Sequence, residues 1–110
     1  MTYEQVADLL ATIDLPFTYW SFPENEAPTL PYFVFYYPSN DDLSADNINY
    51  QTIVNMNLEL YSENKDFTLE KRVEDVFTSN GIYFQKSEQY IRNERMHEVL
   101  YEVQLIITEE

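Results

Sequence analysis

The sequence has no cysteine, one glycine and few basic residues, and each shortage excludes a class of function. Without cysteine the chain can form neither disulfides nor thiolate metal sites. Because Gly81 is the sole glycine, neither a phosphate-binding loop nor a dinucleotide fingerprint is possible. No apolar run approaches the ~20 residues that span a bilayer, and the N-terminus lacks the basic segment of a signal peptide. We therefore expect a soluble intracellular protein with no cofactor and no membrane contact.

Basic residues are few and unevenly distributed. The chain has six Lys and Arg against twenty Asp and Glu, which gives a net charge of -14. The first 64 residues contain ten acidic residues and no basic one. Such a surface repels phosphates and anionic lipids, which argues against direct nucleic-acid binding. It also raises the hypothesis of an acidic inhibitor that mimics DNA. Against mimicry, the acidic residues alternate with core positions in strands or cluster in loops, without regular spacing on one surface.

Residues 50–61, YQTIVNMNLELY, form the clearest pattern in the chain. Val54, Met56, Leu58 and Leu60 point to one face, and mostly polar residues point to the other. Side chains alternate across a strand, so this pattern predicts a long strand with one buried face. A long strand with one polar face is typical of an antiparallel sheet that another layer covers on one side.

The remaining elements follow from periodicity and from start and stop signals. Thr2 and Gln5 have the form of a capping box and predict a helix over residues 2–13. Asp66 as N-cap and Gly81 as stop delimit a second helix over 67–80, with Glu70 and Glu74 on its polar face. Further strands are predicted over 17–22, 32–37, 82–91 and 96–108. The order α-β-β-β-α-β-β indicates one α+β domain over residues 1–110, with about five strands in an antiparallel or mixed sheet and two helices on one face.

Two polar loops, residues 23–31 and 39–49, are predicted to be flexible, and the second is long for a compact domain. Tyrosine, of which the chain has ten, is enriched at protein interfaces. We expect the loops, with the turn at residues 92–95, to contact partners or other subunits. The candidate contact residues are Glu24, Glu26, Asp41, Asp42, Asp46, Tyr50, Arg92 and Arg95.

Candidate chemistry is sparse. Asp41, Asp42 and Asp46 offer oxygen ligands for Ca²⁺ or Mg²⁺, which would suit a metal-dependent enzyme, but their spacing matches no EF-hand and the loop lacks glycine. A solvated acidic loop is the favoured interpretation. His97 is the single histidine and cannot build a usual zinc site, so we expect it to be packed or half-exposed. Nothing places Ser79 or Ser87 on a nucleophile elbow. We expect no enzymatic activity and no metal site.

The second half of the chain carries a family pattern. A long strand ends in ELY, and a helix of the form E-x-x-V-E-D-x-F follows a short charged turn. Next come F-x-K-S-E-x-Y-I and a Met-initiated strand that ends in Y-E-V-Q-L. In the first half, P-Y-F-V-F-Y and S-A-D-N-x-x-Y fit more loosely. Over about residues 16–108 the chain resembles the small tail terminator, tail completion or head–tail joining proteins of long-tailed phages and prophages of Gram-positive bacteria.

The resemblance implies an α+β subunit that assembles into a hexameric ring and contains no catalytic residue. The ring would cap the tail tube, stop its polymerisation and dock onto the neck or connector protein. It would sit at the tail–neck junction of the virion, after assembly in the host cytoplasm, with DNA passing through without specific binding. A head–neck adaptor of the same joining region is the alternative that the resemblance leaves open. Exposed sheet edges and tyrosines would supply the head-to-tail contacts of a ring.

Overall fold

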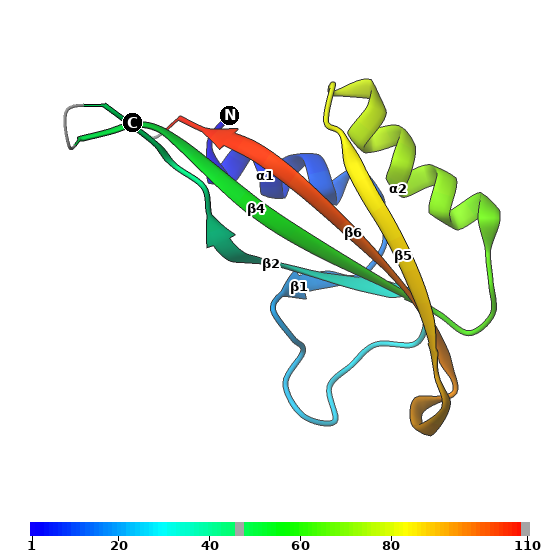
Figure 1. Cartoon of the computed structure of the whole chain (residues 1–110). Helices are drawn as coiled ribbons and strands as arrows, with labels where there is room; N and C mark the ends of the chain where they lie inside the picture. Colours follow the sequence, from blue (N-terminus) through cyan, green and yellow to red (C-terminus); the bar gives the residue numbers. More distant parts are fainter. Residues whose placement is uncertain (46–47, 109–110) are drawn as a thin grey trace.

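The computed structural model describes the backbone of residues 1–45 and 48–108, and the side chains of residues 1–42 and 51–108. It confirms the α+β class (Figure 1). The elements in chain order are α1 (Tyr3–Ala11), β1 (Phe17–Tyr19), β2 (Tyr32–Asn40), β3 (Leu43–Ala45), β4 (Ile48–Ser62), α2 (Phe67–Ser79), β5 (Phe84–Ile91), the 3-10 turn η1 (Arg92–Glu94) and β6 (Met96–Ile107).

The sheet is mixed, with spatial order β1-β2-β4-β6-β5, and β3 pairs with β4 outside this path. Only β1 and β2 run parallel; the other pairs are antiparallel. The predicted order α-β-β-β-α-β-β is confirmed by the five strands of the main path. Strand β4 is central: it pairs with β2 along one side and with β6 along the other, from Thr52 opposite Ile107 to Ser62 opposite His97.

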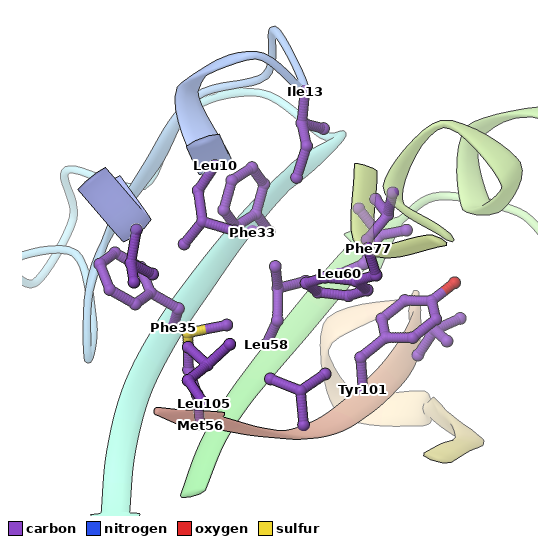
Figure 2. Close-up of a cluster of buried hydrophobic side chains, with 14 of the residues drawn as sticks. Leu10, Ile13, Phe33, Phe35, Met56, Leu58, Leu60, Phe77, Tyr101 and Leu105 are labelled. Atoms are coloured by element: carbon purple, nitrogen blue, oxygen red, sulfur yellow. The ribbon is translucent and has the colours of Figure 1, made fainter. Parts of the chain in front are cut away.

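The core lies on the face of the sheet to which the even-numbered side chains of β4 point (Figure 2). Val54, Met56, Leu58 and Leu60 are at most 1% exposed, which confirms the predicted alternation. Both helices contribute to the same hydrophobic cluster, α1 through Val6 and Leu10, and α2 through Leu69, Val73 and Phe77. The odd-numbered residues of β6 complete this cluster, from Val99 to Ile107.

Local signals begin both helices as predicted, whereas α1 ends at Ala11, two residues before its predicted end. Thr2 and Gln5 form the capping box of α1, with side-chain oxygens accepting from backbone N–H groups at 3.1 and 2.9 Å. The Asp66 side chain accepts from the N–H of Leu69 at 3.0 Å and caps α2. Gly81 follows α2 with a φ of 68°, in the left-handed region that favours glycine. No described helix has both the length and the apolar composition needed to cross a membrane.

Three expectations about the first half of the chain were wrong. Residues 39–49 are not a simple loop, because β2 extends to Asn40 and a hairpin of β3 and β4 follows. Strand β2 does not end at residue 37 as predicted. Pro38 lies within it, where the register shifts between Tyr36 and Ser39, at a bulge that tolerates a residue without an N–H. Strand β1 ends at Tyr19, because Trp20 has a φ of 70°. Residues 23–31 form neither helix nor strand, as predicted.

Candidate interaction surface

The face of the sheet opposite the core carries a row of polar and aromatic side chains across four strands. Tyr32 of β2, Tyr61 of β4, Glu98 of β6 and Gln89 of β5 occupy successive paired positions. Tyr36 and Asn57 occupy a parallel row, and Glu59 lies between the rows. We call the set Tyr32, Tyr36, Asn57, Glu59, Tyr61, Gln89 and Glu98 the tyrosine–glutamate surface. The odd-numbered residues of β4 that alternation excludes from the core therefore form a contiguous polar surface.

Short hydrogen bonds connect this surface. The Tyr61 hydroxyl lies 2.5 Å from Oε1 of Glu59 and 2.9 Å from Oε2 of Glu98. A phenol has one proton, so the two carboxylates share a single donor. The Tyr36 hydroxyl donates to Oε2 of Glu59 at 2.7 Å, and Nε2 of Gln89 donates to Oε1 of Glu98 at 2.5 Å. These carboxylates are therefore held by the protein's own donors.

The environment favours the neutral phenols. Burial and the carboxylates of Glu59 and Glu98 raise the pKa of Tyr61 far above its usual value. Burial also raises the pKa of Tyr36, with a further contribution from Glu59. For Tyr32 the pKa is raised by burial and by the charge of Glu94. All three hydroxyls stay protonated at neutral pH, and those of Tyr36 and Tyr61 serve as donors, a role suited to binding and positioning.

An aromatic segment after β1 borders this surface. The Trp20 ring lies 4.6 Å from that of Tyr36, and the Phe22 ring lies 5.3 Å from that of Tyr32, both centroid to centroid. The Tyr32 ring in turn lies 5.4 Å from that of Tyr61. Trp20 itself is 59% exposed. Exposed tryptophan beside tyrosines is a composition enriched at protein interfaces.

A second polar cluster lies toward the other end of the same face. Oδ2 of Asp41 accepts from Nδ2 of Asn55 at 2.8 Å and from Nε2 of Gln104 at 3.1 Å. Oδ1 of Asp42 accepts from the N–H of Ile53 at 3.0 Å. The carboxylates of Asp41 and Asp42 therefore attach the short connection between β2 and β3 to the neighbouring strand β4. Beside them an open groove of about 1010 Å³ is lined by Met1, Pro38, Asn55, Tyr83, Gln104 and Ile106, among others.

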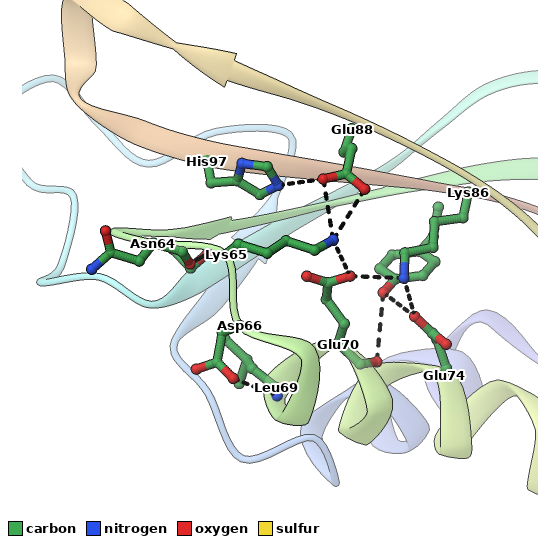
Figure 3. Close-up of polar contacts among 11 residues, drawn as sticks. Asn64, Lys65, Asp66, Leu69, Glu70, Glu74, Lys86, Glu88 and His97 are labelled. Carbon is green, nitrogen blue, oxygen red and sulfur yellow. Dashed lines mark hydrogen bonds and ion pairs between the residues drawn. The ribbon is translucent and has the colours of Figure 1, made fainter.

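An ion-pair cluster joins α2 to β5 on the core side (Figure 3). Glu70 has one carboxylate oxygen 2.8 Å from Nζ of Lys65 and 2.7 Å from Nζ of Lys86. Lys86 also contacts Glu74 at 2.8 Å, and Lys65 contacts Glu88 at 3.0 Å. The expectation that Glu70 lies on the solvated face of its helix was wrong, because the residue is 2% exposed. Two lysines from other elements neutralise it there.

The pKa directions follow this pairing. Lys65 and Lys86 lower the pKa of Glu70, against the effect of burial, which is the largest single contribution and raises it. The carboxylates raise the pKa values of both lysines, again against burial. Nε2 of His97 lies 2.9 Å from Oε1 of Glu88, and the His97 side chain is 14% exposed. The expectation of a packed or half-exposed histidine is thus confirmed.

The structure separates the predicted contact residues into two groups at opposite ends of the sheet (Figure 1). Glu24 and Glu26 lie exposed in the loop before β2, and Arg92 and Arg95 lie exposed in the turn between β5 and β6. These segments share one end, because Tyr32 at the start of β2 pairs with Tyr61, which pairs with Glu98 after the turn.

The second group lies at the hairpin end. Asp41 and Asp42 have the contacts described above, and Tyr50 lies in β4, with its side chain outside the described residues. Asp46 lies outside the described residues altogether. Among residues whose placement is described, no group of three or more His, Asp or Glu is arranged to hold a metal ion.

The residues that sequence reasoning missed are Tyr61, Glu98 and Glu70. The alternation of β4 and β6 placed Tyr61 and Glu98 on the polar face, but their contact depends on strand register. No protein-family model matches the chain. A search of curated proteins finds no match either.

Proposed function

We propose that this chain is a structural subunit of the head–tail junction of a long-tailed phage or prophage, a tail terminator that forms a ring. The resemblance over about residues 16–108 motivates the proposal. One structural observation supports it most: the two ends of a molecule about 50 Å long carry different contact features. One end presents the loop before β2 and the turn with Arg92 and Arg95. The other presents the β3–β4 hairpin.

Different surfaces at opposite ends suit a head-to-tail ring. Heterologous contacts close into a ring when one surface of a subunit binds a different surface of the next. The hairpin extends beyond β6, since β4 pairs with β6 only from Thr52 onward. A two-stranded hairpin is marginally stable alone in water, so a neighbouring subunit or the tail tube is its natural support.

The charge of the chain fits a bore that DNA crosses without adhering. A net charge of -14 per subunit repels phosphates, and a hexamer multiplies the effect. In this proposal the partners are a second copy of the chain, the tail tube protein and the neck or connector protein, at the tail–neck junction of the virion. A head–neck adaptor would use the same ring geometry at the neighbouring position.

The test is a tube-growth assay with the tail tube protein of the same phage or prophage. We expect the chain to stop tube growth and to appear by electron microscopy as a six-fold ring at one end of each tube. Arg92→Glu with Arg95→Glu should weaken capping, because it reverses the charge of one proposed contact end. A matched control exchanges an exposed ion pair on α2, Lys71→Asp with Asp75→Lys, and should cap like the wild type.

Three outcomes would overturn the proposal. Tubes that grow to the same length with and without the chain would exclude a terminator. A ring that binds the isolated connector and ignores the tube would identify the adaptor instead. Displacement of DNA from a restriction enzyme or a repressor at low salt would point to DNA mimicry, the alternative that the net charge raises.

A further inference from the structure

Strand β5 forms one outer edge of the sheet in the described part of the chain. It ends the path β1-β2-β4-β6-β5, and no other described strand pairs with it. Residues 85–90 are exposed, and their pairing with β6 runs without a register shift from Phe84 to Ile91. The segment contains no proline. Bulges, prolines and unpaired charges are devices that keep edge strands from pairing with other chains. Strand β5 has neither bulge nor proline, and its charged residues Lys86 and Glu88 are neutralised by ion pairs within the protein.

The direction of the backbone groups along this edge follows from the sheet register. In an antiparallel sheet the N–H and C=O of one residue face the same neighbour, and successive residues alternate. The C=O of Ile53 accepts from Asp41, so odd residues of β4 face away from β6. Even residues of β4 therefore face β6, where their partners are odd. Even residues of β6 face β5, and their partners are Gln85, Ser87 and Gln89.

The even-numbered residues of β5 consequently point their backbone N–H and C=O groups away from β6, toward the free edge. These residues are Phe84, Lys86, Glu88 and Tyr90. The sequence of the strand, FQKSEQY, is nearly symmetric about Ser87. Two antiparallel copies centred on Ser87 would place Phe84 opposite Tyr90, Gln85 opposite Gln89 and Lys86 opposite Glu88. Each of these cross-strand pairs is favourable: aromatic with aromatic, amide with amide, and opposite charges.

Neighbouring registers are unfavourable. The outward-pointing N–H and C=O groups of the two copies stay opposite each other only if the pairing shifts by an even number of positions, and the smallest such shift is two. It then places Lys86 opposite the Lys86 of the other copy, or Glu88 opposite the other Glu88. Like charges directly opposite each other destabilise a strand pair. Among these three registers, the one centred on Ser87 alone both satisfies the backbone and pairs the charges.

We propose that β5 binds β5 of a second copy across a twofold axis at Ser87, so that two sheets join into one continuous sheet. This inference does not rest on the proposed function, because a twofold contact is isologous whereas a ring contact is heterologous. The surface is an edge-pairing site of the free protein, additional to the contacts at the two ends of the molecule.

Ion pairs balance much of the charge at this edge, in a chain whose net charge opposes self-association. Four of the six basic residues lie in β5, contact it or follow it directly. They are Lys65, which bonds Glu88, then Lys86 within the strand, and Arg92 and Arg95 after it. Helix α2 lies over the β5–β6 pair, with the Phe77 ring 5.9 Å from that of Phe84 and 6.0 Å from that of Tyr101. No described strand or helix is hydrogen-bonded along the outer edge itself.

The absence of cysteine makes disulfide capture a direct test. In the proposed register Ser87 lies opposite its own copy at a position where the backbone groups point away from the interface. Side chains are closest at such positions, within reach of a disulfide. Ser87→Cys should therefore form a covalent dimer in a glutathione redox buffer. Gln89→Cys is the matched control: its two copies would lie about 13 Å apart along the strands, too far to be bridged.

We expect Ser87→Cys to cross-link at least about tenfold faster than Gln89→Cys, and light scattering to show a wild-type dimer that strengthens with salt. Ser87→Asp, which puts like charges at the axis, should weaken this dimer by up to about fivefold. Circular dichroism checks that the variants fold. Equal cross-linking of the two cysteine variants, or a wild type that stays monomeric at high concentration and high salt, would overturn the proposal. Tube capping by a chain that shows no such dimer would leave the proposed function intact.

Discussion

The Nζ atom of Lys86 lies 2.7 Å from a carboxylate oxygen of Glu70, a side chain that is 3% exposed. Lys86 belongs to β5 and Glu70 to the first turns of α2, so this contact joins a helix to the strand at the sheet edge. Lys65 approaches the same oxygen from the connection before α2. A buried carboxylate is tolerated there because two ammonium groups compensate for its lost hydration.

Glu70→Ala should lower the free energy of unfolding by about 2 kcal/mol, because it leaves two lysines without their shared partner. The loss stays below that of a fully buried pair because both lysines are partly exposed and can turn to water. Urea unfolding followed by circular dichroism measures the change. Asp75→Asn removes the exposed pair with Lys71 on the same helix and should cost under about 0.5 kcal/mol.

The same cluster should make stability depend on pH. Glu70 has a folded pKa below its usual 4.5, so its contribution is present above about pH 4.5 and is lost as pH falls through the folded pKa. Lys65 and Lys86 have pKa values raised above 10.5, so their contribution holds below that pH and is lost above the folded values.

Lower pH also relieves repulsion among the twenty acidic residues, so the wild type alone is ambiguous. The informative quantity is the difference in unfolding free energy between the wild type and Glu70→Gln. We expect this difference to be largest near pH 7 and to shrink below about pH 4. A difference that is constant with pH would mean that the charge of Glu70 contributes nothing.

Alkaline titration should reveal protected tyrosines. Burial and carboxylate neighbours raise the pKa of Tyr61 and of Tyr101, and burial with neighbouring tyrosines raises that of Tyr37 to about 12. At pH 11 the absorbance change at 295 nm of the folded protein should therefore fall short of the change for ten tyrosines. Unfolding in guanidinium chloride should recover the missing signal. Tyr61→Phe should reduce the unfolded signal and leave the folded one at pH 11 unchanged.

Gly81 gives a test of backbone strain without steric complication. A Cβ added there meets nothing within 4 Å, but the φ of 68° is costly for residues with a side chain. Gly81→Ala should therefore destabilise the protein by about 1 kcal/mol, measured by urea unfolding. Gly81→Asn should cost less, because asparagine tolerates the left-handed region. Equal costs for both substitutions would indicate a cause other than backbone strain.

Local chemistry along the chain specifies the secondary-structure elements, so these could be predicted from the residues alone. Alternation in residues 50–61 predicts the central strand, because a period of two fixes which side chains face the core. Thr2, Asp66 and Gly81 predict the helix boundaries, because capping needs only atoms within a few residues. The α+β class and the order of elements follow from these local patterns.

Features that depend on contacts between distant segments could not be predicted in this way, because they arise only when the sheet and the helices pack together. Glu70 reads as a solvated helix residue, yet Lys65 and Lys86 allow its burial once α2 packs beside β5. Pro38 reads as a strand end, yet a bulge against β4 accommodates it. Tyr61 and Glu98, 37 residues apart, meet through the register of β4 and β6. Hydrogen bonds and ion pairs act over a few ångströms, so only the assembled sheet determines which of many polar side chains are brought together.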